Sequence, residues 1–334
     1  MKSFLAATAP GTIEGSQNNA YNQASANQSL TRAFVNIYLM KDGTPFTDKA
    51  GYETMSFVDE FKDRDARLAQ TVRGPEYKMV QTVGGTTAAL TAPDIKSMAA
   101  PLGYHVIKFS LDKTLVAGEI EGKHNTNSTP LYRYAEALLN YAEAKAELGD
   151  LSDADWAKTV GALRSRAGVA SAKPAKADSY FQSNFYPGIS NPVLLEILRE
   201  RLCELCIEGP AGNDWKRFAV GESFAKFPWK GIHFSALNTA IDINGDGTAD
   251  YYFSDSEPAD ETSKSIWVNV KTSGSEEGLY AVANSKGGYD LEYRLGANKR
   301  NWESDGRLYL DAISQEEISK YKQNGFTLTQ NPGY

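Results

Sequence analysis

The stretch TPLYRYAEALLNYAEAKAELGD, residues 129–150, carries the clearest structural signal in this chain of 334 residues. Its apolar side chains recur at helical spacing, which predicts an amphipathic helix with one buried face. Gly149 and Asp150 supply a C-terminal stop. The predicted buried face contains Leu131, Tyr134, Ala135, Leu138, Leu139, Ala142 and Ala146.

A second helix is expected directly after the first. Ser152 and Asp155, three residues apart, match a capping box, and Gly168 supplies the stop. Two antiparallel helices with small residues at their contact form the unit that tetratricopeptide repeats stack. Solenoids generally need about three or more such units, and one is visible here. We therefore expect partner helices to be supplied elsewhere or to be missing.

A longer helix is predicted over residues 191–209, where Asn191 and Pro192 provide the cap and the first turn. One face of this helix is apolar and is expected to be buried. The other positions are charged, and their spacing predicts cross-turn ion pairs on a mostly solvated face. These charged residues are Arg199, Glu200, Arg201, Glu204 and Glu208.

The two cysteines of the chain, Cys203 and Cys206, lie deep inside that predicted helix. A redox pair normally stands at a helix N-terminus, which lowers the pKa of one thiol. A structural zinc site needs further Cys or His ligands, and no second motif accompanies this pair. We therefore predict two buried, inert thiols.

Loop-rich sequence lies on both sides of the helical region, which spans residues 129–220. These flanking segments are residues 1–128 and 221–334. We predict a mainly α fold of helices and loops, in which helical hairpins pack against a loop-rich, partly β region.

Short regular elements are expected inside the loop-rich segments. Residues 52–72 have helical periodicity, and residues 103–111 alternate imperfectly as a strand would. Further along, residues 265–271 predict a strand, and Ser314 with Glu317 predicts the start of a last short helix.

Composition excludes some classes of partner. The net charge is −7 with a pI near 5.2, and no long run of Lys or Arg occurs, so a nucleic-acid partner is not expected. No stretch approaches the roughly 20 apolar residues of a membrane-spanning helix. The N-terminal apolar run is too short for a signal peptide, so the chain as written carries no targeting signal.

The stretch IDINGDGTADYYF resembles a calcium-binding EF-hand loop. Gly247 occupies the sixth position of that loop, but Phe253 stands where the bidentate Glu should be. A weak structural calcium (Ca²⁺) site and a plain Asx-rich turn both fit this pattern. The candidate ligands are Asp242, Asn244, Asp246, Thr248 (through its carbonyl) and Asp250.

Signs of an enzyme are weak. His105, His124 and His233 lie far apart, and neither a nucleophile elbow nor a phosphate-binding glycine loop occurs. With 42 acidic residues, some pair of carboxylates will always have the spacing that glycoside hydrolysis needs. A glycoside hydrolase therefore stays an alternative, but no specific motif supports it.

Several motifs closely resemble the C-terminal half of SusD-like proteins, the RagB/SusD family, and follow the order in which that family has them. These motifs are YLMKDGTPF (38–46), FKDRDARL (61–68), RYAEALLNYAEAKAELGD (133–150), RSRAGV (164–169), ERLCELCIEGPAGNDWKRF (200–218) and TQNPGY (329–334). The resemblance implies one SusD-like domain over residues 1–334, apparently without its N-terminal part. It departs at residues 310–313, where the family usually has a proline-containing segment.

The family resemblance also implies a function. Its members are outer-membrane surface lipoproteins of Bacteroidota that bind glycans and pass them to a TonB-dependent (SusC-like) transporter for carbohydrate uptake. We therefore expect a non-catalytic, surface-exposed protein whose membrane attachment is only through an N-terminal lipid anchor not present in this chain. The TQNPGY tail is expected to dock on the helical body, and Glu208, Asp214 and Arg217 to fix the loop after the long helix.

Sugar binding would need exposed aromatic faces rimmed by polar groups. The candidates are Trp229, Tyr21 and Tyr77, because the other tryptophans lie in predicted scaffold elements. The alternative is a helical protein-docking module that binds no sugar, which a contiguous apolar patch on the helical side would favour.

Overall fold

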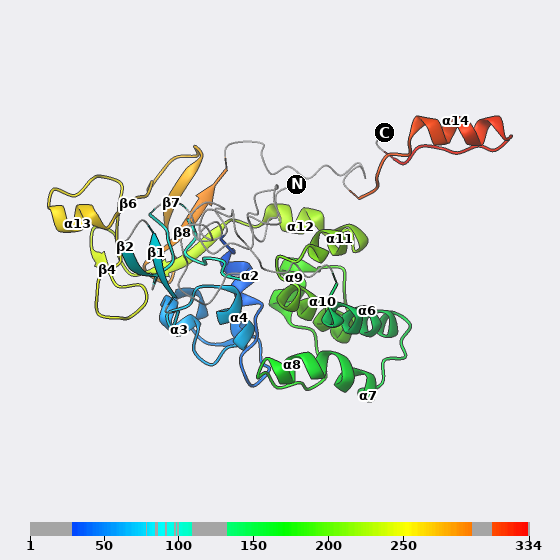
Figure 1. Ribbon diagram of the computed structural model, residues 1–334, viewed down its shortest axis with the longest axis horizontal. Helices are drawn as coiled ribbons and strands as arrows, with labels where there is room; N and C mark the ends of the chain where they lie inside the picture. Colours follow the sequence, from blue (N-terminus) through cyan, green and yellow to red (C-terminus); the bar gives the residue numbers. More distant parts are fainter. Residues whose placement is uncertain are drawn as a thin grey trace.

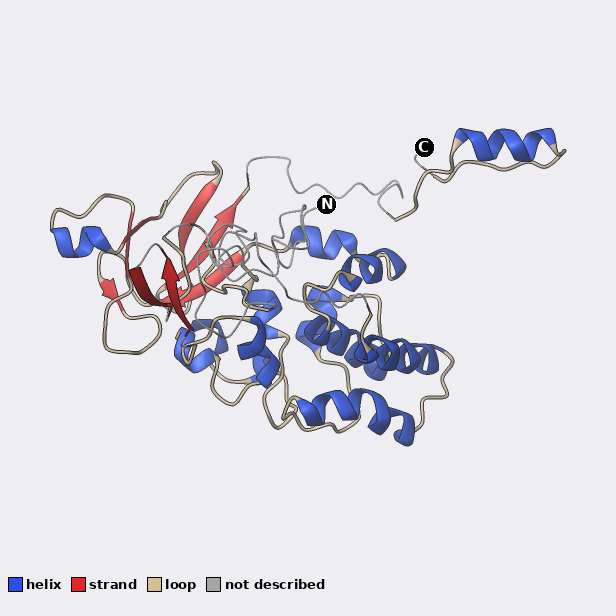
Figure 2. Cartoon of the chain, viewed as in Figure 1, coloured by secondary structure: helices blue, strands red, loops and turns tan. Residues whose placement is uncertain are grey.

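The computed structural model describes residues 29–77, 79–83, 86–90, 92–96, 98, 100–108, 132–295 and 309–332. Within these residues, helices form one side of the molecule and short β-sheets the other (Figures 1 and 2). The fold is mainly helical, with small sheets beside a helical layer, as the sequence predicted.

Most of the helices in the described residues lie before residue 227. They are α2 (Arg32–Asn36), η2 (Phe46–Asp48), η3 (Tyr52–Thr54), α3 (Phe57–Glu60), α4 (Ala66–Thr71), α6 (Tyr134–Glu147), α7 (Asp153–Trp156), the π-helical η4 (Ala157–Gly161), α8 (Ala162–Arg166), α9 (Ser179–Phe185), α10 (Pro192–Glu204), α11 (Pro210–Arg217) and α12 (Gly221–Lys226). Two more follow, α13 (Glu261–Ser265) and α14 (Gln315–Gln323).

The strands form three small sheets. β1 (Met79–Val83) pairs with β2 (Thr86–Leu90), and β3 (Lys230–Phe234), β8 (Tyr289–Arg294) and β7 (Gly278–Ala283) make an antiparallel sheet in that order. In the third sheet, β5 (Tyr251–Ser254) lies antiparallel to β4 (Ala240–Ile241) and parallel to β6 (Trp267–Asn269).

The second helix of the hairpin begins and ends at the capping residues predicted from the sequence. Ser152 and Asp155 form a full capping box at the start of α7, and Gly168 adopts a positive φ of 69° where the second helix ends. Asn191 caps α10 through the backbone N–H groups of Val193 and Leu194.

The single helix predicted over residues 52–72 is wrong. The structure breaks this segment into η3, α3 and α4, because Ser56 and Asp65 act as new N-caps and Asp63 adopts a left-handed φ of 54°. The predicted strand at residues 103–111 is reduced to isolated bridges, His105 with Ser29 and Val106 with Val72. Its last residues lie outside the described part of the chain.

The solvated face predicted for the long helix is also wrong, because the charged side chains of α10 are buried. The residues concerned are Glu196, Arg199, Glu200, Arg201 and Glu204. Each of them meets an opposite charge, so the cost of removing it from water is offset by direct ion pairs and hydrogen bonds.

The partners come from segments far away in the chain. Arg67 of α4 contacts Glu200 at 2.5 Å and Glu204 at 3.0 Å, and Arg164 of α8 contacts Glu196 and Glu200. Three arginine-containing segments thus converge on one helix, so each is fixed relative to the others. The remaining pairs are Arg166 and Arg133 with Glu204, Arg199 with Asp178, and Arg201 with Asp214.

The loop after α10 is fixed by the same kind of contact. Asp214 accepts hydrogen bonds from Arg201 and Arg217, and Glu208 pairs with Arg133 and Lys108. The expected scaffold role of Glu208, Asp214 and Arg217 agrees with these contacts. The thiols of Cys203 and Cys206 are buried beside them, and burial raises the pKa of Cys206 to about 11, as expected for inert thiols.

The C-terminal segment pairs with itself. Gln330 exchanges hydrogen bonds with the backbone of Ile313, and the Asn331 side chain donates to the carbonyl of Asp311. We expected this tail to dock on the helical body. As far as Pro332, its hydrogen bonds go instead to the residues before α14. Helix α14 itself stands apart from the other helices in Figure 1. Gly333 and Tyr334 lie outside the described residues.

The buried ion pairs predict a large cost for removing one cation. Arg67→Met is expected to lower the free energy of unfolding by about 3–5 kcal/mol, because Asp65, Glu200 and Glu204 would keep buried charges without their partner. Lys226→Ala, which removes an exposed pair with Glu222, is the control and is expected to change it by less than about 0.5 kcal/mol. Urea unfolding of both variants provides the measurement, and equal small effects would contradict a structural role for the buried pairs.

Candidate functional site

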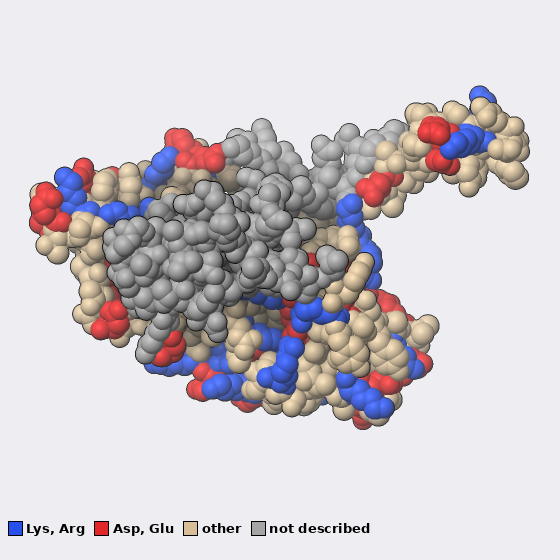
Figure 3. Space-filling view, in the orientation of Figure 1, with Lys and Arg blue, Asp and Glu red and all other residues tan. Residues whose placement is uncertain are grey.

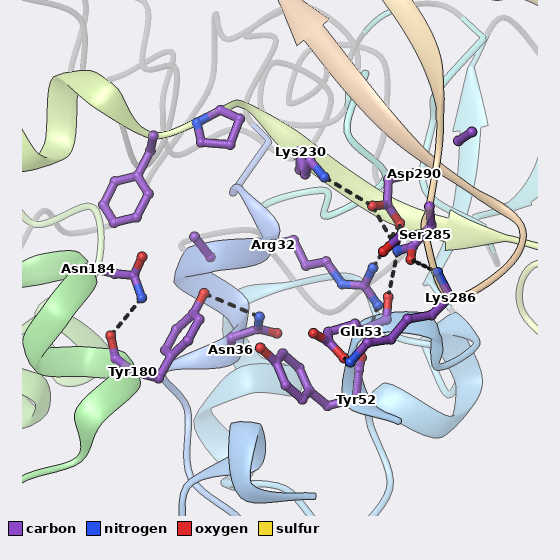
Figure 4. Close-up of a pocket in the computed structure, with 15 residues that line it drawn as sticks. Arg32, Asn36, Tyr52, Glu53, Tyr180, Asn184, Lys230, Ser285, Lys286 and Asp290 are labelled. Carbon is purple, nitrogen blue, oxygen red and sulfur yellow. Dashed lines mark hydrogen bonds and ion pairs between the residues drawn. The ribbon is translucent and has the colours of Figure 1, made fainter. Parts of the chain in front are cut away.

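A cleft of about 430 Å³ opens where the helical layer meets the β3–β8–β7 sheet (Figure 4). Its volume lies within the range of small-molecule sites, about 300–1,000 Å³. The cleft is lined by Arg32, Ala33, Asn36, Tyr52, Glu53, Tyr180, Asn184, Phe227, Pro228, Lys230, Ala283, Asn284, Ser285, Lys286 and Asp290.

Helix α2 brings two buried polar residues to the cleft. Thr31 caps this helix through the N–H of Phe34, and Arg32 and Asn36 follow four residues apart, so they share one side of the helix. Polar groups on a short, capped helix are held in fixed positions, as a binding site requires.

Aromatic rings form one wall. Tyr52 of η3 and Tyr180 of α9 meet edge to face with ring centroids 6.3 Å apart, and Phe46 supports Tyr52 from behind at 6.0 Å. Burial raises the pKa of Tyr180 to about 12, so its hydroxyl stays protonated at neutral pH. This wall offers apolar ring surface next to hydroxyl groups.

Arg32 organises the base of the cleft. Its guanidinium donates to Glu60 at 2.5 Å, to Asp290 at 3.1 Å and to the carbonyl of Tyr52 at 3.2 Å. Burial acts to raise the pKa of Asp290, but its hydrogen bond with His233 and the charge of Arg32 hold that pKa below its usual value. Asp290 is therefore a stable carboxylate.

The β7–β8 hairpin delivers the opposite wall. Gly288 turns this hairpin with a φ of 65°, and a Cβ there would lie 2.6 Å from the ring of His233. Asn284 donates to both oxygens of Asp290, and Lys286 forms an ion pair with Glu53 at the rim. The turn thus places Lys286 beside η3, as Figure 4 shows.

The binding residues predicted from the sequence lie in different places. Trp229 is half-buried next to the cleft, between the lining residues Pro228 and Lys230, and its ring stacks on Tyr293 at 6.5 Å. Tyr77 lies elsewhere, 5.5 Å from the guanidinium of Arg73. Tyr21 is outside the described residues.

Sequence reasoning missed the residues that line the cleft. Asn36, Tyr52 and Tyr180 come from three separate segments, and each looks ordinary in its own segment. The sequence pointed to this region at one place only. The predicted binding residue Trp229 directly follows Phe227 and Pro228, which line the cleft.

The Asp-rich loop holds its own backbone. Asp242 accepts hydrogen bonds from the N–H groups of Gly245 and Gly247, and Asp250 accepts from Ile243 and Asn244. Asn244 reaches Asp246 at 3.2 Å, and Thr248 donates its N–H to Asp246.

These hydrogen bonds are those of an Asx-rich turn. Burial and the nearby charges of Asp246 and Asp242 raise the pKa of Asp250. Among the described residues, no group of three or more His, Cys, Asp or Glu side chains is placed to hold a metal ion. Calcium binding by the loop stays a prediction.

A second hollow, of about 740 Å³, lies between α6 and α11. Most of its charged residues are paired with one another: Arg217 contacts Glu143, and Arg201 contacts Asp214. This hollow is therefore part of the scaffold. On the face seen in Figure 3, acidic and basic residues of the described part are interspersed.

Comparison with known proteins agrees with this architecture. A family model described as the SusD family matches residues 6–334. The fold is similar to that of a SusD-like protein from Bacteroides fragilis (BF3747), with a TM-score of 0.51, 18% identity, and coverage of 92% of this chain and 47% of that protein. A search of curated proteins found no match.

A second solved structure, the selenomethionine form of BT4246, has a TM-score of 0.49 at 17% identity and covers 92% of this chain and 46% of that one. The chain thus spans about half the length of these two solved proteins. Within the described residues, no helix combines the length and apolar character needed to cross a bilayer.

Proposed function

The chain belongs to the SusD family, and from that premise we propose that it binds glycans at the cell surface, without catalysis, for delivery to a TonB-dependent, SusC-like transporter. Display on the outer membrane through a lipid anchor is part of the proposal. The observation that supports it is the cleft between α2, α9 and the β7–β8 hairpin, which combines aromatic rings with amide groups.

The lining of the cleft suits a sugar. Sugar rings present C–H surfaces that pack on aromatic side chains, and their hydroxyls exchange hydrogen bonds with amide and charged groups. Tyr52, Tyr180 and Phe227 supply the rings, and Asn36 and Asn184 supply amides.

The cleft is poorly suited to glycoside hydrolysis. Such an enzyme needs one carboxylic acid with a raised pKa and a second carboxylate across the bond that breaks. The pKa of Asp290 is lowered, and Glu53 is paired with Lys286. Burial raises the pKa of Glu60, but this residue is fully buried behind Arg32 and Tyr104. This agrees with the family, whose members are non-catalytic glycan-binding proteins.

Trp229→Ala is expected to weaken retention of the bound glycan by roughly fivefold, because the variant removes an aromatic ring beside the cleft, worth about 1 kcal/mol. Affinity gels containing plant, host or microbial polysaccharides measure retention, with released reducing ends monitored. Tyr321→Ala, which removes an exposed ring from α14, is the control. Product release would contradict a non-catalytic role, and the absence of retention by the folded wild-type chain would contradict glycan binding.

Protein docking is the second candidate function, and the outer face of α6 favours it. Tyr134, Tyr141 and Leu148 follow one another at intervals of seven residues and are 78%, 48% and 77% exposed. The prediction that Tyr134 lies on the buried face of this helix is therefore wrong. Ala137 and Ala144 lie between them, also exposed. This spacing places an apolar stripe along one side of the helix, which is the pattern of a helix-docking face.

The double variant Tyr134→Ser and Tyr141→Ser is expected to reduce co-purification with a SusC-like transporter by about tenfold or more, because it removes two apolar contacts. Glycan retention should stay unchanged, since α6 contributes no residue to the cleft. Undiminished co-purification would show that this face does not contact the transporter.

A further inference from the structure

Asn36, in the lining of the cleft, has a buried polar atom without a hydrogen-bond partner among the described residues. The side chain is 5% exposed, its Nδ2 donates to the hydroxyl of Tyr180 at 3.4 Å, and its Oδ1 has no hydrogen-bond partner among the described residues. Exchanging the amide oxygen and nitrogen would leave the nitrogen open instead, so one end is unpartnered in either assignment. A buried polar atom without a partner destabilises a fold, and in the lining of a cleft it points to a ligand group.

Arg32, one helical turn from Asn36, has a buried hydrogen-bond donor that lacks a partner within the described residues. Its two terminal nitrogens are taken by Glu60, Asp290 and the carbonyl of Tyr52, but its Nε is buried and has no partner in the described part of the chain. Arg32 and Asn36 both line the cleft from the same side of α2. With Asn36 Nδ2 donating to Tyr180, the site offers one acceptor and one donor. Together they complement a hydroxyl group, since a hydroxyl both donates and accepts.

The charges around the cleft are already balanced. Lys230 lies 3.3 Å from Asp290, Lys286 pairs with Glu53, and Arg32 is held by Glu60 and Asp290. A carboxylate ligand could accept hydrogen bonds but could not donate to Asn36 Oδ1, and it would meet Glu53 and Asp290. The balance favours a neutral ligand.

The rings beside Asn36 supply the apolar contact that a sugar needs. Figure 4 shows Asn36 between Tyr180 and Tyr52, with Arg32 on its other side. The two rings meet edge to face, so part of each ring borders the same space.

We propose that this cleft binds a neutral sugar residue of the glycan, with its hydroxyls donating to Asn36 and accepting from Arg32 and its ring packed beside Tyr52 and Tyr180. This inference rests on the proposed function and deepens it by naming the site and the class of sugar. A uronate is disfavoured because its carboxylate would lie beside Glu53 and Asp290, among cations that are already paired.

Asn36→Leu separates binding from folding. Because the Asn36 amide is only half satisfied, its replacement by an apolar side chain of similar size is expected to leave the melting temperature unchanged or higher. The same change should weaken sugar binding by about tenfold, since a sugar hydroxyl loses its acceptor. Asn324→Leu on the exposed α14 cap is the matched control, and Tyr52→Leu is a second cleft variant to use if Asn36→Leu does not fold.

The probes are neutral gluco-, manno-, galacto- and xylo-oligosaccharides, with oligogalacturonate as the acidic counterpart, titrated calorimetrically into the full chain. The proposal predicts that a neutral oligosaccharide binds and that Asn36→Leu and Tyr52→Leu weaken it while Asn324→Leu does not. If both cleft variants bind as tightly as the wild type, the cleft is not the site, although glycan binding stands. Binding of oligogalacturonate alone would overturn the neutral class, and no binding of any probe or polysaccharide would overturn both proposals.

Discussion

The structure depends on the burial of charged side chains along α10. Five charged residues of this helix are buried, and each is stabilised by an opposite charge from another segment. Burying such charges is costly unless every partner is in place, so the network tolerates one arrangement of the surrounding segments. The motifs that carry the family resemblance supply most of these partners, including Arg67, Arg164 and Asp214.

One residue of the network connects the scaffold to the cleft. Arg199 donates to the carbonyl of Ile37, which ends α2, and forms an ion pair with Asp178, which caps α9. Helix α2 carries Asn36 and α9 carries Tyr180, so a single buried guanidinium sets the distance between the amide and one wall of the cleft. The relative position of Asn36 and Tyr180 is therefore fixed by the buried contacts of Arg199 in the core.

Local signals in the sequence predicted the starts of α7 and α10, because caps such as Ser152 and Asn191 act within a few residues. The caps Ser56 and Asp65, which divide residues 52–72, were overlooked. The charged face of α10 was misread because buried and solvated ion pairs have the same spacing within a helix. The difference lies in partners such as Arg67, which is 133 positions from Glu200. The cleft was missed for the same reason, since its residues meet only in the folded chain. Trp229, chosen because the other tryptophans lie in predicted scaffold elements, stands between two lining residues, and its part in binding stays a prediction.

Hydrogen exchange on Arg199→Met tests most directly whether the α10 network holds the cleft together. With the variant kept below its melting temperature, the account predicts that backbone amides of α2 and α9 lose protection together, while those of the β7–β8 hairpin keep theirs. The reason is that Arg199 contacts both helices and none of the hairpin residues. Unchanged protection in α2 and α9 would contradict the account and would mean that the cleft is held by its own contacts.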